Sequence, residues 1–381
     1  MYDLIVIGGG ASGIICAIVA RMRGKKVLIV DSNNFVGKKL LVTGNGKCNL
    51  TNINCDSTFY NQNIDQYLKK FDVKQTLKFF DELGLVTYYD EEGRVYPYSN
   101  SAKSVLEVLN RKLLELGVEM ETNKNVCKVE KHETFCVYTD ANVYKSRKVV
   151  FATGGKTIEF IKNNFKTKNK TNMPSLCALL TESTKKLSGI RLSDVSVTVK
   201  CDGKIKSEIG EVLFKDSGVS GIVVFNLSSM FARFGKFSGE ISINLMPKIS
   251  RDCIRKMLVE RCQKYNTLCD AFVGWFQKEI SNEIIRKSGM DDKHTTDLNK
   301  NEIERIVDSI TNLTYKVVGN YDNNQVYSGG VLLSELTENL ESKIHNGLYF
   351  CGEICDVDGV CGGYNLQWAW TSGYIVGESV W

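Results

Sequence analysis

Residues 2–13 read Tyr-Asp-Leu-Ile-Val-Ile-Gly-Gly-Gly-Ala-Ser-Gly, a short apolar run followed at once by a glycine-rich turn. Such a run is typical of a buried parallel strand, and residues 14–23 have the pattern of a helix. A second apolar run at 26–30 leads into the acidic residue Asp31. A glycine motif alone is weak evidence, but strand, turn, helix, strand and acid together predict a dinucleotide-binding βαβ unit.

The glycines of such a turn have different roles. Gly8 permits the tight turn, Gly10 lets the backbone approach a pyrophosphate, and Gly13 lets the helix pack closely on the strand. The pyrophosphate is expected at the helix N-terminus, where free N–H groups and the helix dipole favour an anion. Asp31 is expected to accept hydrogen bonds from the ribose hydroxyls of adenosine. The alternative is a glycine-rich turn without a ligand.

The glycine motif does not separate NAD from FAD, and the next stretch bears on that choice. Residues 37–52 read Gly-Lys-Lys-Leu-Leu-Val-Thr-Gly-Asn-Gly-Lys-Cys-Asn-Leu-Thr-Asn. This composition is poor for a helix or a strand and favours a loop that offers backbone amides to a phosphate or a flavin. A purely structural loop is the alternative.

The same stretch resembles the signature of the BaiN-like, aminoacetone-oxidase-like FAD flavoproteins. Three further blocks resemble that family in its order: Gly-Arg-Val-Tyr-Pro at 93–97, Phe-Ala-Thr-Gly-Gly at 151–155 and the long block at 347–369. The chain is identified as a member of this family. The resemblance implies FAD as the cofactor, with NAD(P)H as a transient electron donor if one is used.

The C-terminal block is consistent with this resemblance. A strand ending at Phe350 would present Gly352 and Glu353 at the carboxyl edge of the sheet, where ligands of open α/β folds bind. The family implies that Glu353 or Asp358 lies near the ribityl chain, although ordinary loop capping is the alternative. A helix at 365–376 would begin after Gly362-Gly363 and could face the flavin.

The residues predicted to bind the cofactor are Gly8, Gly10, Ala11, Ser12, Gly13, Asp31, Lys39, Thr43, Gly44, Asn45, Gly46, Cys48, Asn49, Val126, Ala152, Thr153, Gly154, Gly352, Glu353, Asp358, Gly363, Asn365 and Leu366.

The chain departs from the family pattern in two places. Residues 156–173 are polar and rich in lysine and asparagine, where the family has a Gly- and Ser-rich stretch. Residues 214–222 lack the histidine and proline that relatives often carry there. Chemistry assigned to that histidine in relatives therefore cannot be transferred.

The predicted fold is α/β: a Rossmann-type FAD-binding domain with an inserted strand-rich subdomain and a small helical cap. The FAD domain is predicted at 1–186 and 316–381, the β-rich substrate subdomain at 187–250 and the helical subdomain at 251–315. Period-two alternation predicts strands at 195–200 and 240–245. Helices are predicted at 252–265, 269–286 and 301–313, the last opened by Asn299 or Lys300. The chain is expected to return to the sheet at 317–331. The substrate is expected between the insertion and the flavin.

Composition narrows the class of protein. The chain has 43% hydrophobic residues, 24% charged residues and a net charge of +5. The basic residues are scattered, so no nucleic-acid partner is expected. There is no membrane-length apolar run and no signal peptide, which favours a cytoplasmic protein that binds a small molecule, with no membrane and no obligate protein partner. The 13 cysteines form no Cys-x-x-Cys pair, so no metal is predicted.

Two enzymatic hypotheses and one non-enzymatic hypothesis remain. The chain could pass hydride from NAD(P)H to a C=C bond conjugated to a carbonyl, as the resemblance to BaiN implies for bile-acid or steroid-like 3-oxo intermediates. It could instead be an amine oxidase of the aminoacetone type that uses O₂, or a non-catalytic FAD-binding sensor. The many cysteines slightly favour the reductase, because peroxide endangers thiolates. Tyr364 is the candidate proton donor, since none of the three histidines lies in a family block.

Overall fold

The computed structural model describes residues 1–182, 184–291, 293–322 and 324–380. The chain forms two compact units, Met1–Met173 with Gln325–Trp381, and Pro174–Asn324. The second unit begins earlier in the sequence, and ends later, than the predicted insertion at 187–315. The physical reason is that two strands outside that range or at its edge, β11 (Leu179–Thr181) and β16 (Leu313–Asn320), pair within its barrel.

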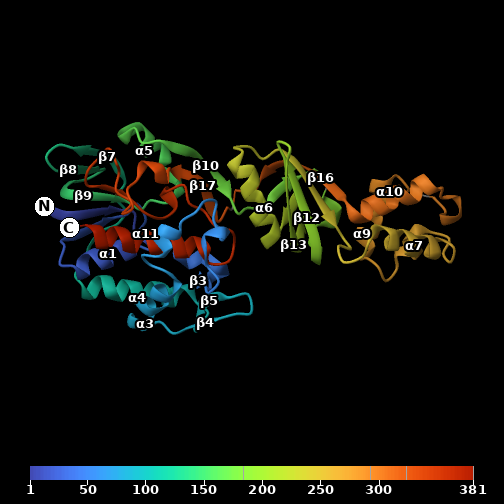
Figure 1. Ribbon diagram of the computed structural model, residues 1–381, viewed down its shortest axis with the longest axis horizontal. Helices are drawn as coiled ribbons and strands as arrows, with labels where there is room; N and C mark the ends of the chain where they lie inside the picture. The colour runs from blue at the N-terminus through green and yellow to red at the C-terminus, as the bar shows by residue number, and fades with distance from the viewer. Residues whose placement is uncertain (183, 292, 323, 381) are drawn as a thin grey trace. The chain divides into compact units, whose positions relative to one another are not determined.

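The first unit is built on a seven-stranded sheet of order β6-β2-β1-β9-β8-β7, in which β18 also pairs with β9 (Figure 1). Strands β1, β2, β6, β9 and β18 are parallel, whereas β7 and β8 are antiparallel. This confirms the α/β, Rossmann-type fold. The strands of this sheet are β1 (Tyr2–Ile7), β2 (Val27–Val30), β6 (Glu119–Glu121), β7 (Val126–Lys131), β8 (Phe135–Thr139), β9 (Val143–Phe151) and β18 (Leu348–Phe350).

Two helices far apart in sequence pack against each other in this unit (Figure 1). They are α1 (Ala11–Met22) and α11 (Tyr364–Ser379), which includes the predicted helix at 365–376. A Cβ atom on Gly373 would lie 2.4 Å from the Ser12 carbonyl oxygen, and one on Gly377 would lie 2.7 Å from Val19 Cβ. The helix contact therefore needs glycine at both positions.

The remaining elements of the first unit surround the sheet. A small sheet of order β3-β5-β4 lies among them, and β10 pairs with β17 where the chain leaves and re-enters the unit. The elements are η1 (Lys38–Gly46), β3 (Thr51–Asn52), η2 (Ser57–Phe59), α2 (Asp65–Leu68), α3 (Val73–Glu82), β4 (Thr87–Tyr89), β5 (Arg94–Pro97), α4 (Ala102–Glu115), η3 (Gly155–Thr157), α5 (Ile158–Phe165), β10 (Asn169–Ser175), β17 (Val326–Val331), η6 (Leu333–Glu335) and η7 (Gly352–Ile354).

The stretch at 37–52, predicted to be a loop, is partly helical. Residues of η1 form 3₁₀ turns that are interrupted where Gly44 and Asn45 adopt left-handed backbone angles, with φ of 55° and 53°. The prediction missed these turns because 3₁₀ bonds need only three residues and leave no long apolar period.

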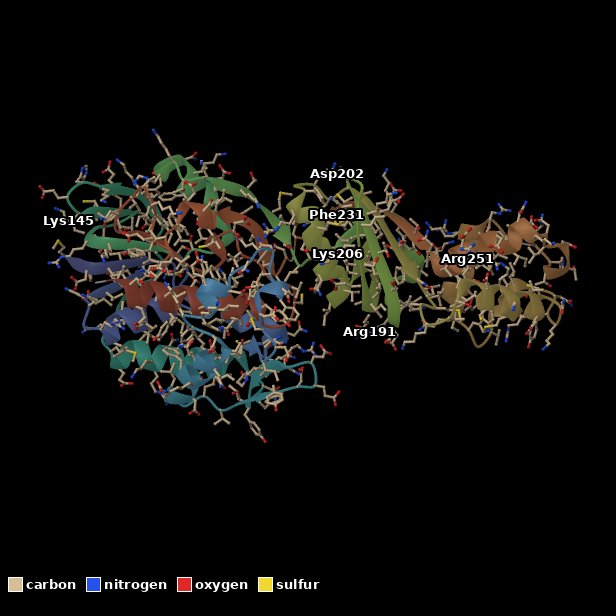
Figure 2. All side chains as sticks on the ribbon, viewed as in Figure 1. Lys145, Arg191, Asp202, Lys206, Phe231 and Arg251 are labelled. Atoms are coloured by element: carbon tan, nitrogen blue, oxygen red, sulfur yellow. The ribbon has the colours of Figure 1, made fainter. Side chains whose placement is uncertain are left out.

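The second unit contains a closed barrel of order β11-β14-β13-β12-β15-β16. The strand predicted at 195–200 lies within β12, and the one predicted at 240–245 coincides with β15 up to Asn244. Phe231, labelled in Figure 2, belongs to α6. It is fully buried in the core of this unit, as is the ring pair of Phe214 and Tyr315. The prediction that 317–331 returns to the sheet is wrong at its start, because β16 continues in the barrel to Asn320. The elements are β11, β12 (Arg191–Cys201), β13 (Lys204–Lys215), β14 (Gly218–Ser220), β15 (Gly239–Asn244), β16, η4 (Lys185–Leu187) and α6 (Ile222–Arg233).

A helical segment follows β15. It contains α7 (Arg251–Cys262), α8 (Leu268–Phe272), α9 (Lys278–Ser288), η5 (Thr295–Asp297) and α10 (Lys300–Thr311). The single helix predicted at 269–286 is wrong, because the chain turns at Gly274, where φ is +85°. The last helix was predicted to open at Asn299 or Lys300, and the cap is Asn299, through a capping box with Glu302.

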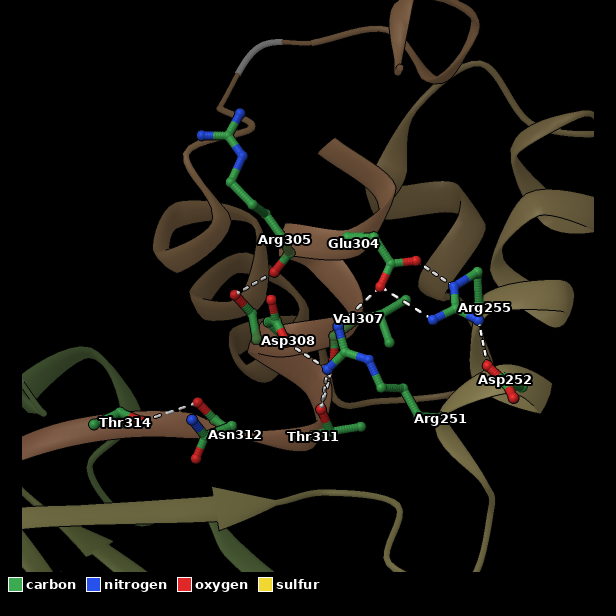
Figure 3. Close-up of polar contacts among 11 residues, drawn as sticks. Arg251, Asp252, Arg255, Glu304, Arg305, Val307, Asp308, Thr311, Asn312 and Thr314 are labelled. Carbon is green, nitrogen blue, oxygen red and sulfur yellow. Dashed lines mark hydrogen bonds and ion pairs between the residues drawn. The ribbon is translucent and has the colours of Figure 1, made fainter. Parts of the chain in front are cut away.

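An ion network joins α7 to α10 in this segment (Figure 3). Glu304 accepts hydrogen bonds from Arg255 and from Arg251 Nη2, the latter at 2.9 Å, and Arg251 also pairs with Asp308. The two guanidinium groups, first Arg255 and then Arg251, lower the pKa of Glu304 to about 2. A carboxylate with a lowered pKa stabilises the folded state above its unfolded pKa, and this contribution is lost as the pH falls.

We expect Glu304→Gln to lower the urea midpoint of unfolding at pH 7. The deficit relative to the unaltered chain should shrink as the pH falls from 5 towards 3, since acid protonates the glutamate of the unfolded chain. The matched control is Glu260→Gln, at an exposed position of α7. A deficit of constant size at every pH would contradict this account of the network.

Candidate functional site

The glycine turn after β1 is forced by close contacts. Gly8 has φ of +101°, and a Cβ atom there would lie 2.5 Å from the carbonyl oxygen of Ala152. A Cβ atom on Gly13 would lie 2.0 Å from the Gly8 carbonyl oxygen. At Gly10 the nearest atom would be Ala152 O at 3.9 Å, which leaves that side of the turn open. Two glycines therefore make the fold possible, and the third leaves room for a ligand.

Helix α1 begins on Gly10 and has no acidic residue in its first turn. The backbone N–H groups of its first turn, including those of Ala11 and Ser12, have no intrahelical acceptors and are available to an anion. The Ser12 side chain is buried and donates to the Cys351 carbonyl at 3.3 Å, so its hydroxyl serves packing in this structure.

Asp31 follows the end of β2, and its side chain is hydrogen-bonded to the glycine turn after β1. Its Oδ2 accepts the Gly9 N–H at 2.6 Å, and its Oδ1 accepts the backbone and side-chain N–H groups of Asn33 at 2.7 and 2.8 Å. Lys124 N–H donates to the Asp31 carbonyl at 3.0 Å, which brings the start of β7, at Val126, to this edge. Two residues predicted to bind the cofactor, Asp31 and Val126, therefore belong to neighbouring segments.

The ends of β9 and β18 supply the next part of the site. Ala152 N–H donates to Ile7 O at 2.8 Å and Cys351 N–H donates to Phe151 O at 3.0 Å, so both chain ends are held to the sheet. After them come Thr153 and Gly154 on one side and Gly352 and Glu353 on the other. The carboxyl edge of the parallel sheet thus gathers predicted residues from three distant parts of the chain.

Glu353 is the hub of a polar cluster at this edge. Its Oε2 accepts from Lys39 Nζ at 2.7 Å and its Oε1 accepts the Tyr327 backbone N–H at 2.7 Å. A Cβ atom on Gly154 would lie 3.4 Å from Glu353 Oε2. The ion pair fastens the η1 segment to the C-terminal block, directly beside the Ala-Thr-Gly turn.

The η1 segment is tied to the glycine turn at its start and braced by a hydrogen bond of its own. Gly37 N–H donates to Gly9 O at 2.6 Å, and the Thr43 hydroxyl donates to Leu40 O at 2.6 Å. Gly44, Asn45 and Gly46 then follow with left-handed backbone angles. Cys48 is fully buried, and burial raises the pKa of its thiol to about 11. The Cys48 thiol therefore stays protonated at neutral pH, and the role of this residue towards a cofactor stays a prediction.

Asn49 joins this segment to the start of α11. Its side-chain amide donates to Thr51 O at 3.0 Å and accepts from Gly363 N–H at 3.1 Å. Gly363 has φ of +99°, and a Cβ atom there would lie 2.5 Å from Thr51. Two predicted residues that are far apart in sequence, Asn49 and Gly363, are thus in direct contact.

Two other predicted residues of the C-terminal block have structural partners. Asn365 uses its amide oxygen and nitrogen to bond Gly359 N–H and O at 2.9 and 2.8 Å. Asp358 is 5% exposed and accepts from the Ser328 hydroxyl at 3.2 Å. Leu366 is half-buried and packs against the main core. These contacts shape the turn at 359–363, and the roles of the three residues towards a cofactor stay predictions.

Tyr364 forms part of the wall of this turn. Its ring stacks on Phe59 with centroids 4.3 Å apart, and a Cβ atom on Gly362 would lie 2.7 Å from its edge. Burial, followed by the charges of Cys55 and Asp56, raises the pKa of Tyr364 to about 12. The phenol therefore keeps its proton at neutral pH.

Sequence reasoning missed the segment that braces this block. Asn61 exchanges hydrogen bonds with Asp358: its N–H donates to Asp358 O at 3.0 Å and its Oδ1 accepts Asp358 N–H at 2.9 Å. Gln367 is fully buried and bonds Thr51, Thr76 and Thr371. Nothing in the local pattern marks Asn61, because its partner is some 300 residues away.

The geometry fits an extended dinucleotide such as FAD. The open side of Gly10 and the free N–H groups of α1 suit a pyrophosphate, and Asp31 lies where adenosine ribose would be held. The Glu353 cluster and the turn at 362–363 lie on the opposite side of the β1 end, where a ring would be placed. In the part of the chain that the structure describes, no three His, Cys, Asp or Glu side chains are grouped to hold a metal, and no helix could cross a membrane.

Comparison with known proteins gives a family match over almost the whole chain. The family described as HI0933-like protein Rossmann domain matches residues 2–379. The 3-dehydro-bile acid delta(4,6)-reductase of Clostridium scindens is 33% identical, over 100% of this chain and 99% of that protein. The ribosomal RNA dihydrouridine synthase of Escherichia coli is 27% identical, over 100% of this chain and 98% of that protein.

Among solved structures, 3-ketosteroid-delta4-(5alpha)-dehydrogenase from Rhodococcus jostii RHA1 aligns with 100% of this chain and 96% of its own. The TM-score is 0.48 and the identity 12%.

We expect Gly10→Ala to separate folding from cofactor binding. Gly10 has φ of −80°, which alanine adopts readily, and the new methyl group would meet no protein atom closer than 3.9 Å. The apoprotein should melt at the unaltered temperature, while FAD affinity falls by about fivefold or more because overpacking a tight contact costs about 1–3 kcal/mol. Fluorescence titration of the apoprotein with FAD measures the dissociation constant, and thermal unfolding of the apoprotein measures its melting temperature.

The matched control is Gly13→Ala, which should destabilise the apoprotein itself because its methyl group would collide with the Gly8 carbonyl. Full FAD affinity in Gly10→Ala would show that the turn does not approach the cofactor.

Proposed function

The chain belongs to the HI0933-like Rossmann-domain family and is an FAD-dependent oxidoreductase, and we propose that it reduces a C=C bond conjugated to a carbonyl. The substrate class we propose is a 3-oxo steroid of the bile-acid type, with NAD(P)H as the electron donor. In the net reaction the β-carbon gains a hydride and the α-carbon a proton, while NAD(P)H becomes NAD(P)⁺.

One observation carries this proposal. The bile-acid reductase of Clostridium scindens is 33% identical across essentially the full length of both chains. A protein named for delta(4,6) reduction of a 3-dehydro-bile acid removes unsaturation conjugated to a 3-oxo group. The dihydrouridine synthase removes the C=C bond of uridine, which is also conjugated to a carbonyl. The two relatives thus share a bond type although their substrates differ.

The residues of the site can support this reaction. Bound FAD would supply the hydride-transfer chemistry, and the protein supplies binding, orientation and charge. The α1 N-terminus and Asp31 would hold the pyrophosphate and ribose, and Glu353 with Lys39 would hold the ring end. We propose Tyr364 as the donor of the proton to the α-carbon, since its phenol stays protonated at neutral pH.

A second candidate substrate is uridine in RNA. The Escherichia coli relative, at 27% identity over the full chain, supports it. The net charge of +5 with 44 acidic residues gives no concentrated basic footprint, so we rank a small molecule first.

The proposed function can be tested with the purified flavoprotein under anaerobic conditions. NADH or NADPH should bleach the flavin, and a Δ4-3-oxo bile acid should then restore its colour and gain two hydrogens by mass spectrometry. The control substrate is the same 3-oxo steroid without the double bond, which should leave the flavin reduced. Reoxidation by a uridine-containing ribosomal RNA fragment alone would select the second candidate. Bleaching by aminoacetone alone, with reoxidation only by O₂, would select an amine oxidase, and no turnover with any pair would select a sensor.

We expect Tyr364→Phe to lower the rate of enone reduction by about 100-fold, the lower range for loss of a general acid. The Phe59 stack and the flavin spectrum should be unchanged, because phenylalanine keeps the ring. Tyr89→Phe, at a 64% exposed tyrosine of β4, is the control. Unaltered turnover in Tyr364→Phe would assign the proton to another donor.

A further inference from the structure

A cavity of about 360 Å³ lies beside α4 and shares no lining residue with the cofactor cradle. Apolar side chains line part of it, from Leu85, Val86 and Val108. The remaining lining includes an aromatic ring, Tyr98, and two charged side chains of α4, Glu107 and Arg111. Apolar surface with a few convergent polar groups is the usual make-up of a small-molecule site.

Tyr98 is placed to stack on a planar group. Its N–H donates to Val86 O at 2.8 Å, which fixes the backbone just after β5. Its ring meets Tyr88 edge-on, with centroids 6.1 Å apart and an interplanar angle of 83°. Even so, Tyr98 is 71% exposed, so ring surface is left for a ligand. Exposed aromatic rings of this kind stack on nucleobases, which all have a planar face.

Arg111 and Glu107 bring charge to the same cavity. They are four residues apart on α4, so they lie on one face of the helix. The Arg111 guanidinium has five N–H donors, and in the described part of the chain its one hydrogen bond goes to the Leu83 carbonyl. The remaining donors suit a phosphate. Glu107 is 3.7 Å from Lys103 Nζ, which offsets its charge, and its carboxylate suits ribose hydroxyls.

We propose that this cavity binds the adenosine-phosphate end of a nicotinamide dinucleotide. The adenine ring stacks on Tyr98, a phosphate pairs with Arg111, and Glu107 accepts hydrogen bonds from ribose. This inference rests on the proposed function, which names NAD(P)H as the electron donor, and the cavity would be the binding site of that donor. The sequence has one strong glycine fingerprint, at residues 8–13, and FAD takes it, so the donor needs a site of another kind.

The small β-sheet connects this cavity to the flavin turn. Tyr88 is directly opposite Tyr96, and Asn52 is directly opposite Arg94, so these four residues and Tyr98 share one face. Asn52 Nδ2 donates to the carbonyl of Gly362 at 3.2 Å. From Arg94 to Pro97 strand β5 rises about 10 Å, at about 3.4 Å per residue, and Tyr98 follows directly. An extended dinucleotide bound at Tyr98 can therefore reach towards the turn at 362–363.

The test uses flavin-loaded protein, in which the cradle is already filled, and ADP-ribose, which lacks the nicotinamide ring. Calorimetry should show that ADP-ribose binds. Tyr98→Ala should weaken binding by about fivefold or more, since stacking of one base contributes about 1–3 kcal/mol. Arg111→Leu should weaken it by about tenfold or more, because a charged hydrogen bond contributes about 1.5–3 kcal/mol. Comparison of AMP with 2′,5′-ADP distinguishes NADH from NADPH as the source of this group.

Three controls keep the test specific. Tyr98→Phe retains the ring and should bind normally. Lys112→Gln removes a positive charge from α4 at a residue that does not line the cavity, and it should also bind normally. Arg111→Lys keeps the charge but loses the planar fork, so it should bind with intermediate affinity. The proposal would be overturned if the unaltered protein did not bind ADP-ribose. It would also be overturned if Tyr98→Ala and Arg111→Leu both bound ADP-ribose as tightly as the unaltered protein.

A kinetic measurement separates this site from the proposed reaction. In Tyr98→Ala and Arg111→Leu, the NADH concentration that gives half-maximal flavin reduction should rise by the same factor as the ADP-ribose dissociation constant. Photoreduced enzyme should reduce the enone at the normal rate in both variants. If photoreduced enzyme fails with every enone while the binding results stand, the reaction is wrong and the site is correct.

Discussion

The absence of side-chain volume around Ser12 is the constraint on which the cofactor cradle depends. A Cβ atom on Gly13 would lie 2.0 Å from Gly8 O, one on Gly352 would lie 2.4 Å from Ser12 Oγ, and one on Gly373 would lie 2.4 Å from Ser12 O. Two segments of the C-terminal block, at Gly352 and Gly373, therefore approach the first turn of α1 at contact distance, and Gly13 brings that turn against the end of β1. Overpacked contacts cost about 1–3 kcal/mol or more, so each glycine is needed for the helix, the sheet and α11 to meet.

Local features were predictable, because their causes lie within a few residues. The strand–turn–helix order after Tyr2 and the Asn299 cap are fixed by backbone geometry and short-range hydrogen bonds. The residues at which the barrel begins and ends were not predictable, since β11 is three residues long and is defined only by its pairing with β14 and β16. The contact of Asn61 with Asp358 was missed for the same reason: neither residue stands out in its own segment, and only the fold brings them together.

Motif residues in the site divide between binding and scaffolding. Cys48 and Asn365 both lie in stretches that mark the family, yet one is a fully buried thiol and the other clamps the backbone of Gly359. Sequence resemblance could select these positions but could not assign their roles, because a residue that shapes a turn and one that touches a ligand look alike in a motif. Glu353 differs, since its carboxylate joins Lys39 and the Tyr327 backbone at the carboxyl edge of the sheet.

The packing of α11 against α1 also bears on how the protein is made. Ribosomes synthesise a chain from its N-terminus, and domains fold as their residues emerge. The βαβ unit of β1, α1 and β2 emerges first, but β18 is at Leu348–Phe350 and α11 ends at Ser379. The second unit, Pro174–Asn324, is complete before either of them. The cradle of the nascent chain thus stays incomplete until α11 has been synthesised, and stable uptake of the cofactor has to follow that step.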